Sequence, residues 1–198
     1  LPKMSAEDVG FRYITHDERD GLAGDCSAYL RQPHDRPFLM VASFINPHDI
    51  CYMAIRDSVQ TEQEKRLAEK GSVETATLDE ALRVPEGATR EEFFERLCPP
   101  LPDNHEPPED EPEAVRELLA QRPFRQKARA EYTAERWRLH RWAYGRLTEM
   151  VDRQIGQVLQ ALREGPHAEN TVVIFTSDHG DLDAAHRMEH KTALYEEA

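Results

Sequence analysis

The spacing of apolar side chains predicts one long helix in the last third of the chain. Between about Thr133 and Glu164, apolar residues recur at steps of three and four, which keeps them on one face of an α-helix. The residues that follow this spacing are Tyr144, Leu147, Val151, Ile155, Val158 and Leu162. Gly165 and Pro166 come directly afterwards and are typical of the end of a helix. Shorter helices are predicted between Asp17 and Gln32 and at residues 90–97 and 113–121.

Two short apolar runs predict strands. Pro37–Ile45 and Thr171–Thr176 are continuously apolar or β-branched, as expected of strands that are buried on both faces of a sheet. The order of strand, long connection, helix and strand predicts an α/β fold, with a mainly parallel sheet flanked by helices. One domain is expected over residues 1–198. The charged, proline-rich stretch at about 50–130 is expected to be an excursion over its surface.

Polar side chains follow both predicted strands. Asn46, Pro47 and His48 come after the first strand, and Asp178 and His179 come after the second. Loops at the carboxyl ends of parallel strands form the sites of such sheets, so both groups are expected on one edge of the sheet. They are expected close together if the two strands are neighbours.

Asp178 and His179 form a candidate metal site. A carboxylate beside an imidazole offers a hard anionic oxygen and a neutral nitrogen to one divalent cation. An ordinary turn is the alternative explanation for an Asp-His-Gly sequence.

Downstream of this pair lies a group of basic side chains, His186, His190 and Lys191. A lysine can neutralise the oxygens of a sulfate or phosphate while a histidine transfers a proton. A solvated, charged turn is the alternative interpretation. His48 could belong to the same site or be an ordinary loop histidine.

Composition excludes some partners and leaves others open. With a net charge of -13, the chain is an improbable partner for nucleic acid or anionic membrane surfaces. No apolar stretch has the length that a bilayer requires. The three cysteines, Cys26, Cys51 and Cys98, are scattered and have no metal-type spacing, which argues against a disulfide framework.

The segment Asn170–Asp181 resembles the one that sulfatases place ahead of their second pair of metal ligands. The spacing of His186, Lys191 and Tyr195 is similar to that in sulfatases, and so is the run from Pro37 to His48. The resemblance implies an alkaline-phosphatase-like fold. It also implies metal-dependent hydrolysis of a sulfate ester by a formylglycine made from a Cys or Ser.

The same resemblance implies a role for each candidate residue. Asp178 and His179 would be ligands of a divalent cation, usually Ca²⁺. Lys191 and His48 would be catalytic, with Lys191 on the sulfate and the bridging oxygen and His48 on the sulfate or the leaving group.

The remaining implications concern the substrate. His186 and His190 would bind it, and the substrate would be a sulfated small molecule or glycan. Sulfatases are usually periplasmic or extracellular, but the oligomeric state and the particular ester are not indicated.

The chain also departs from the sulfatase pattern. The Cys-x-Pro-x-Arg motif that yields formylglycine is absent, as are two acidic ligands that normally precede the matched segment. We therefore expect an internal fragment, inactive alone, whose nucleophile lies outside residues 1–198. Arg187 and His190 stand where many sulfatases have glycine, which concerns the substrate pocket.

Two alternatives remain compatible with these residues. One is a phosphoesterase or phosphotransferase of the same superfamily, in which Asp-His-Gly also follows a strand. The other is a catalytically incomplete domain that serves a binding or structural function.

Overall fold

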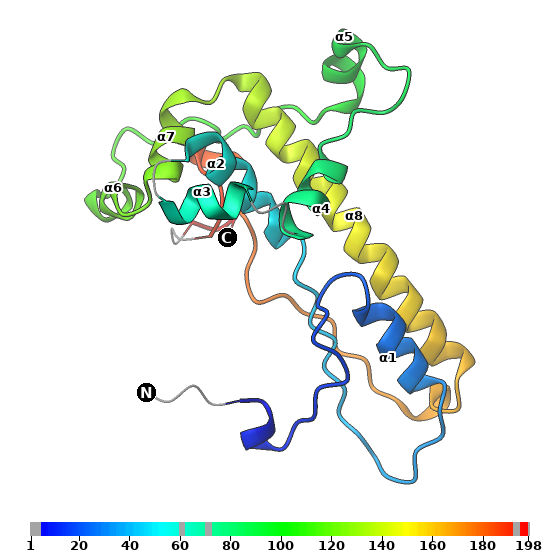
Figure 1. Ribbon diagram of the computed structural model, residues 1–198. Helices are drawn as coiled ribbons and strands as arrows, with labels where there is room; N and C mark the ends of the chain where they lie inside the picture. The colour runs from blue at the N-terminus through cyan, green and yellow to red at the C-terminus, as the bar shows by residue number, and fades with distance from the viewer. Residues whose placement is uncertain (1–4, 60–61, 70–72, 192–194, 198) are drawn as a thin grey trace. The chain divides into compact units, whose positions relative to one another are not determined.

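The computed structural model describes residues 5–59, 62–69, 73–191 and 195–197 (Figure 1). The described residues form two compact units. The first comprises the chain up to Asn46 together with Glu149–Ile174, and the second comprises Pro47–Thr148 together with the chain from Phe175 onward. Each unit is described by itself, and the single-domain organisation stays a prediction.

The first unit contains the predicted helix α1 and the part of the predicted helix α8 from Glu149 onward, while the earlier part of α8 belongs to the second unit. α1 spans Leu22–Leu30, and its buried side chains include Leu22, Cys26 and Leu30. α8 spans Ala134–Glu164, so the long helix predicted from the apolar spacing is confirmed. Neither α8 nor any other described helix is long and apolar enough to cross a membrane.

Gly165 is required at the end of α8 by a close backbone approach. A Cβ atom at this position would lie 2.8 Å from the carbonyl oxygen of Leu30 and 2.9 Å from that of Ala161. Real Cβ atoms do not come so near to backbone oxygens, so a larger residue would separate the end of α1 from the end of α8.

Within residues 50–130 the second unit contains several short helices, separated by irregular segments such as 83–89 and 98–112. Helices at 90–97 and 113–121 were predicted and are confirmed, whereas α2, α3, α4 and α7 were not predicted. The elements are η2 (His48–Ile50), α2 (Cys51–Ser58), α3 (Glu62–Glu69), α4 (Val73–Ala81), α5 (Arg90–Glu92), η3 (Phe93–Leu97), α6 (Glu113–Ala120) and α7 (Pro123–Glu131). Short 3₁₀ turns elsewhere are η1 (Glu7–Val9), η4 (Ala168–Asn170) and η5 (Ala185–Arg187).

These helices bury a core of their own. Met53 and Leu78 are 0% exposed, and Phe93 is 1% exposed. α2 packs against α3 and α7 (Figure 1). The contact between α2 and α7 involves the small side chains of Ala54 and Ala128, which allow a close approach. The segment therefore contributes core residues, in addition to the surface character expected from its charge.

The two predicted strands are absent from the described part of the chain. Residues 37–45 and 171–176 form no ladder and follow an irregular path (Figure 1). The side chains at 171–176 are exposed, and those at 37–45 are exposed or half-buried. Val172 is 88% exposed, Ile174 84% and Leu39 75%. A strand requires hydrogen bonds to a neighbouring strand, and none of the described residues supplies that ladder. The mainly parallel sheet is thus not confirmed here.

The core position of Leu147 on α8 gives a first test of the fold. This side chain is 0% exposed, so Leu147→Ala should lower the free energy of unfolding by about 3 kcal/mol through lost burial and a residual cavity. Denaturant unfolding is the measurement, with Arg153→Ala on the exposed side of α8 as the matched control. Equal effects of the two substitutions would contradict the burial of Leu147.

Candidate active site

A tight loop carries three of the six predicted site residues, His186, His190 and Lys191. We call Asp181–Lys191 the Asp181 loop, because the carboxylate of Asp181 closes it. This carboxylate accepts hydrogen bonds from the backbone N–H of Asp183 at 2.8 Å and from that of His190 at 3.0 Å. The N–H of Leu182 also donates to the carbonyl of His190 at 2.9 Å. The two ends of the loop are therefore held together, with Asp181 beside His190.

The backbone of the Asp181 loop is strained. Five of its non-glycine residues have positive φ, between 42° and 75°: Asp183, Ala184, His186, Arg187 and His190. The left-handed region is unfavourable for residues with a Cβ atom, at a cost of order 1–3 kcal/mol where the surroundings hold such a conformation. The surrounding contacts must therefore hold this loop.

Contacts with other parts of the second unit, to which the loop belongs, supply that support. The imidazole Nδ1 of His105 lies 2.7 Å from the carbonyl oxygen of Ala184, and the N–H of His186 donates to the carbonyl of Asn104 at 2.8 Å. From α8, the guanidinium of Arg141 donates to the carboxylate of Asp183 at 3.0 Å. The loop is thus attached both to α8 and to the chain before α6.

A buried ion pair anchors the part of the loop that precedes His190. Glu189 and Arg125 on α7 lie 3.3 Å apart, with side chains that are 1% and 6% exposed. Burial raises the pKa of Glu189 to about 7, although Arg125 attracts its charge. Burial also lowers the pKa of Arg125. Because desolvation opposes both charges, this pair serves to position the loop more than to stabilise the fold.

His190 and His48 meet beside this ion pair. Their rings are 6.0 Å apart between centroids and nearly perpendicular, at 89°. Burial lowers the pKa of His190 to about 3, helped by the positive charges of Arg125 and Lys191 and by His48 and His179. His190 is therefore a neutral imidazole near pH 7, which can form hydrogen bonds but carries no charge.

Cys51 begins α2 next to the same cluster. Its sulfur lies 3.9 Å from Nδ1 of His48. Burial raises the pKa of its thiol to about 12, with further increases from the carboxylates of Glu189, Asp49 and Asp181. Because only the thiolate is a strong nucleophile, Cys51 is poorly suited to nucleophilic attack.

Asp178 and His179 lie together in a more exposed position. Nε2 of His179 is 3.2 Å from Oδ2 of Asp178, and the two side chains are 35% and 83% exposed. Metal–ligand bonds of about 2.0–2.6 Å that meet near a right angle place two ligand atoms at about this separation. Within the described residues, no group of three or more His, Cys, Asp or Glu side chains is arranged to hold a metal. The pair thus fits as two ligands of a larger set.

The structure brings some of the predicted site residues together and places another elsewhere. His48, His179 and Lys191 all lie within electrostatic range of His190. His186 instead stacks on Tyr195, with ring centroids 4.0 Å apart, and its Nε2 lies 3.9 Å from a carboxylate oxygen of Glu197.

Sequence reasoning did not identify the residues that support this site. Arg125, Glu189 and Asp181 are charged residues in a charged chain, and no spacing rule distinguishes a buried one from a solvated one. The only signal was position, since Asp181 closely follows His179 and Glu189 directly precedes His190.

Comparison with known proteins identifies the class to which this arrangement belongs. The sulfatase family model matches residues 16–198, and the chain therefore belongs to the sulfatase family.

Several curated sulfatases resemble the chain in sequence. A Δ4,5-hexuronate-2-O-sulfatase from Bacteroides thetaiotaomicron is 31% identical over 170 residues, which is 85% of this chain and 29% of that protein. Arylsulfatase K from Danio rerio is 40% identical over 65 residues, 33% of this chain and 12% of that protein. The chain thus spans less than a third of the length of these relatives.

Solved structures show the same relationship. A sulfatase-like protein from Bacteroides thetaiotaomicron superimposes with a TM-score of 0.66 at 28% identity, over 94% of this chain and 36% of that one. A 2-O GAG sulfatase superimposes with a TM-score of 0.65 at 30% identity, over 89% of this chain and 32% of that one. The fold is that of a part of a sulfatase, the alkaline-phosphatase-like class.

The buried carboxylate of Glu189 predicts a pH-dependent stability. A pKa raised from 4.5 to about 7 in the folded state contributes stability that is complete below about pH 4.5 and is lost as the pH rises through about 7. In Glu189→Gln this contribution disappears, so the melting temperature of the variant relative to the wild type should rise between pH 5 and pH 8. At about 1.36 kcal/mol per pKa unit, the difference in unfolding free energy between the variant and the wild type changes by at most about 3 kcal/mol over this pH range.

Thermal unfolding across this pH range is the measurement. Glu117→Gln, an exposed glutamate on α6, is the matched control and should show no such trend. A constant difference between Glu189→Gln and the wild type would mean that Glu189 is already ionised at pH 5.

Proposed function

We propose that this chain forms part of the catalytic domain of an enzyme that hydrolyses sulfate esters. The observation that carries the proposal is the sulfatase match over residues 16–198. The cluster of His48, His190 and Lys191 next to the Asp178–His179 pair supports it, because this arrangement suits an anionic ester bound beside a cation.

The Asp178–His179 pair is proposed to hold a divalent cation, Ca²⁺, together with carboxylates from elsewhere in the natural full-length chain. The 3.2 Å separation of the two ligand atoms supports this assignment. When bound, such a cation would neutralise negative charge on the sulfate oxygens. A formylglycine outside residues 1–198 is the proposed nucleophile, since the motif that produces it does not occur in this sequence.

The remaining site residues are proposed to bind the sulfate and to manage one proton. Lys191 would neutralise the sulfate and contact the bridging oxygen through its ammonium group. His48 would protonate the leaving alcohol. His190 is neutral, so it would donate a hydrogen bond to the substrate without adding charge. His186, which packs on Tyr195, would shape the edge of the pocket.

The proposed substrate is a sulfated saccharide. Two of the similar proteins are named for hexuronate and GAG 2-O-sulfatase activity, which supports a sugar sulfate more than a simple aryl sulfate. The relatives reported above are sulfatases by name, which also favours sulfate over phosphate as the group removed.

The exposed apolar runs at 37–45 and 171–176 are proposed to become strands of a mainly parallel sheet in the natural full-length chain. Their side chains support this proposal. Val172, Val173 and Phe175 are of the β-branched and aromatic types that normally lie in buried strands, yet they are 54–88% exposed here. The resemblance to solved sulfatases over most of the chain supports it as well.

Calcium binding tests the proposed metal ligands. In the natural full-length chain that contains residues 1–198, Asp178→Ala should weaken Ca²⁺ binding strongly, because it removes an anionic oxygen ligand. Isothermal titration calorimetry is the measurement. Asp152→Ala on the exposed side of α8 removes the same charge at a distance and is the matched control. If Asp178→Ala and the wild type bind Ca²⁺ equally well, Asp178 is not a ligand.

Turnover of 4-nitrophenyl sulfate by the natural full-length chain tests the role of Lys191. Lys191→Ala should lower kcat/KM by about 10²–10³-fold, since it removes a positive charge that faces the transferring group. Lys65→Ala, which removes an exposed lysine of α3, should leave kcat/KM unchanged. Retention of full activity by Lys191→Ala, with the fold intact, would refute the assignment.

A further inference from the structure

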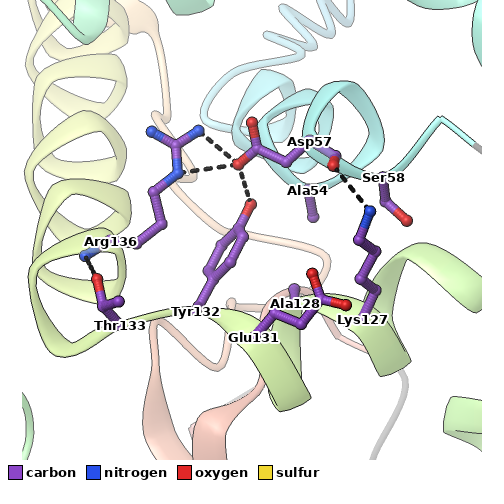
Figure 2. A pocket seen from close by; sticks show the side chains of 9 residues that line it. All are labelled: Ala54, Asp57, Ser58, Lys127, Ala128, Glu131, Tyr132, Thr133 and Arg136. Atoms are coloured by element: carbon purple, nitrogen blue, oxygen red, sulfur yellow. Dashed lines mark hydrogen bonds and ion pairs between the residues drawn. The ribbon is translucent and has the colours of Figure 1, made fainter.

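A pocket separate from the candidate active site lies between α2, α7 and the start of α8 (Figure 2). This α2–α7 pocket has a volume of about 420 Å³, within the range of small-molecule sites. Its lining residues are Ala54, Asp57, Ser58, Lys127, Ala128, Glu131, Tyr132, Thr133 and Arg136. None of the predicted catalytic or metal-binding residues belongs to this set.

On one wall of the α2–α7 pocket the polar side chains are bonded to one another. The carboxylate of Asp57 accepts hydrogen bonds from the hydroxyl of Tyr132 at 2.6 Å and from Nε of Arg136 at 2.9 Å (Figure 2). Burial and the bond to Asp57 raise the pKa of Tyr132, so its hydroxyl stays protonated. Asp57 and Arg136 neutralise one another, and this wall is rigid and has no net charge.

The opposite side of the pocket carries polar groups with unused capacity. Ser58 is 3% exposed, and its hydroxyl has no hydrogen-bond partner among the described residues. The ammonium of Lys127 makes one long contact, 3.5 Å, with the carbonyl oxygen of Asp57. Glu131 lies beside the pocket in Figure 2, one helical turn after Lys127, and its carboxylate forms no ion pair or hydrogen bond with the side chains of the described residues.

The balance of these groups defines the ligand. Lys127 offers a positive donor and Glu131 a negative acceptor, so an ion of either sign would meet one like charge. A polyhydroxylated neutral molecule avoids this conflict, because each hydroxyl both donates to a carboxylate and accepts from an ammonium. The half-buried ring of Tyr132 supplies apolar surface for its C–H groups, whereas Ala54 and Ala128 are 1% and 2% exposed and belong to the core below the pocket.

We propose that the α2–α7 pocket binds an uncharged pyranose unit. This inference rests on the proposed function for the source of that sugar, which would be an unsulfated unit of the glycan substrate. α2 begins at Cys51, three residues after His48, and ends at Ser58, so Ser58 lies about 10 Å along the helix from Cys51 at about 1.5 Å per residue. Contacts with a remote sugar can increase kcat/KM for a glycan relative to a small sulfate ester.

Binding of methyl β-D-glucopyranoside to the natural full-length chain tests the proposal by saturation-transfer NMR and calorimetry. The wild type should bind this neutral sugar, and Glu131→Gln and Lys127→Met should each weaken binding about tenfold or more, because each removes a charged hydrogen-bond partner. Glu117→Gln on α6 should bind like the wild type. Lys191→Ala should also bind like the wild type, since Lys191 belongs to the candidate sulfate site.

The outcomes separate this inference from the proposed function. Sugar binding that is lost in the two pocket variants supports the pocket, whether or not the protein turns over 4-nitrophenyl sulfate. Turnover without sugar binding overturns the pocket and leaves the sulfatase proposal standing. Binding that is unchanged in Glu131→Gln and Lys127→Met also overturns it, as does tighter binding of D-glucuronate than of the neutral glucoside.

Discussion

A buried carboxylate determines where the candidate site can lie. Glu189 has almost no access to solvent, and no described hydrogen-bond donor is aligned with either of its oxygens. Its charge is tolerable only near the guanidinium of Arg125, so the Asp181 loop has to stay against α7. His190 and Lys191 follow Glu189 in the chain and are therefore presented at one fixed place. Hydrogen bonds that involve Asp181, Arg141 and His105 also stabilise the strained backbone of the loop.

The electrostatic character of the site follows from this burial. The same low-polarity surroundings that raise the pKa of Glu189 also keep His190 neutral and Cys51 protonated. The whole chain has a net charge of -13 and would repel a sulfate at long range. Binding of a sulfate at the proposed site would therefore require positive charge close to it. In the proposed site Lys191 would provide that charge, and a cation at Asp178 and His179 would increase it. The neutral imidazole of His190 adds hydrogen-bonding capacity without adding charge.

The two groups of ligands have different supports. The Asp181 loop is anchored by the helices of the second unit, whose core includes Met53 and Phe93. Asp178 and His179 instead follow an extended run whose apolar side chains are exposed. In the sulfatases of known structure that the chain resembles, the aligned region makes up about a third of the molecule. The arrangement of Asp178 and His179, the proposed metal ligands, is thus the part of the candidate site with the fewest contacts to the helical core.

Periodic apolar spacing by itself determined the long helix α8, because thirty-one residues repeat the same pattern and average out local exceptions. Motif order likewise determined the family, whereas the roles of Asp178, His179 and Lys191 stay predictions. The short helices α2 and α7 were not found, because α2 begins with five consecutive apolar residues and α7 is mostly charged or polar, so neither shows apolar residues at steps of three and four. The strands at 37–45 and 171–176 could not be confirmed, since a strand exists only when a partner completes its hydrogen bonds. Only the tertiary structure revealed the pairing of Arg125 with Glu189 and the neutrality of His190, because burial and charge proximity depend on contacts between residues far apart in the sequence.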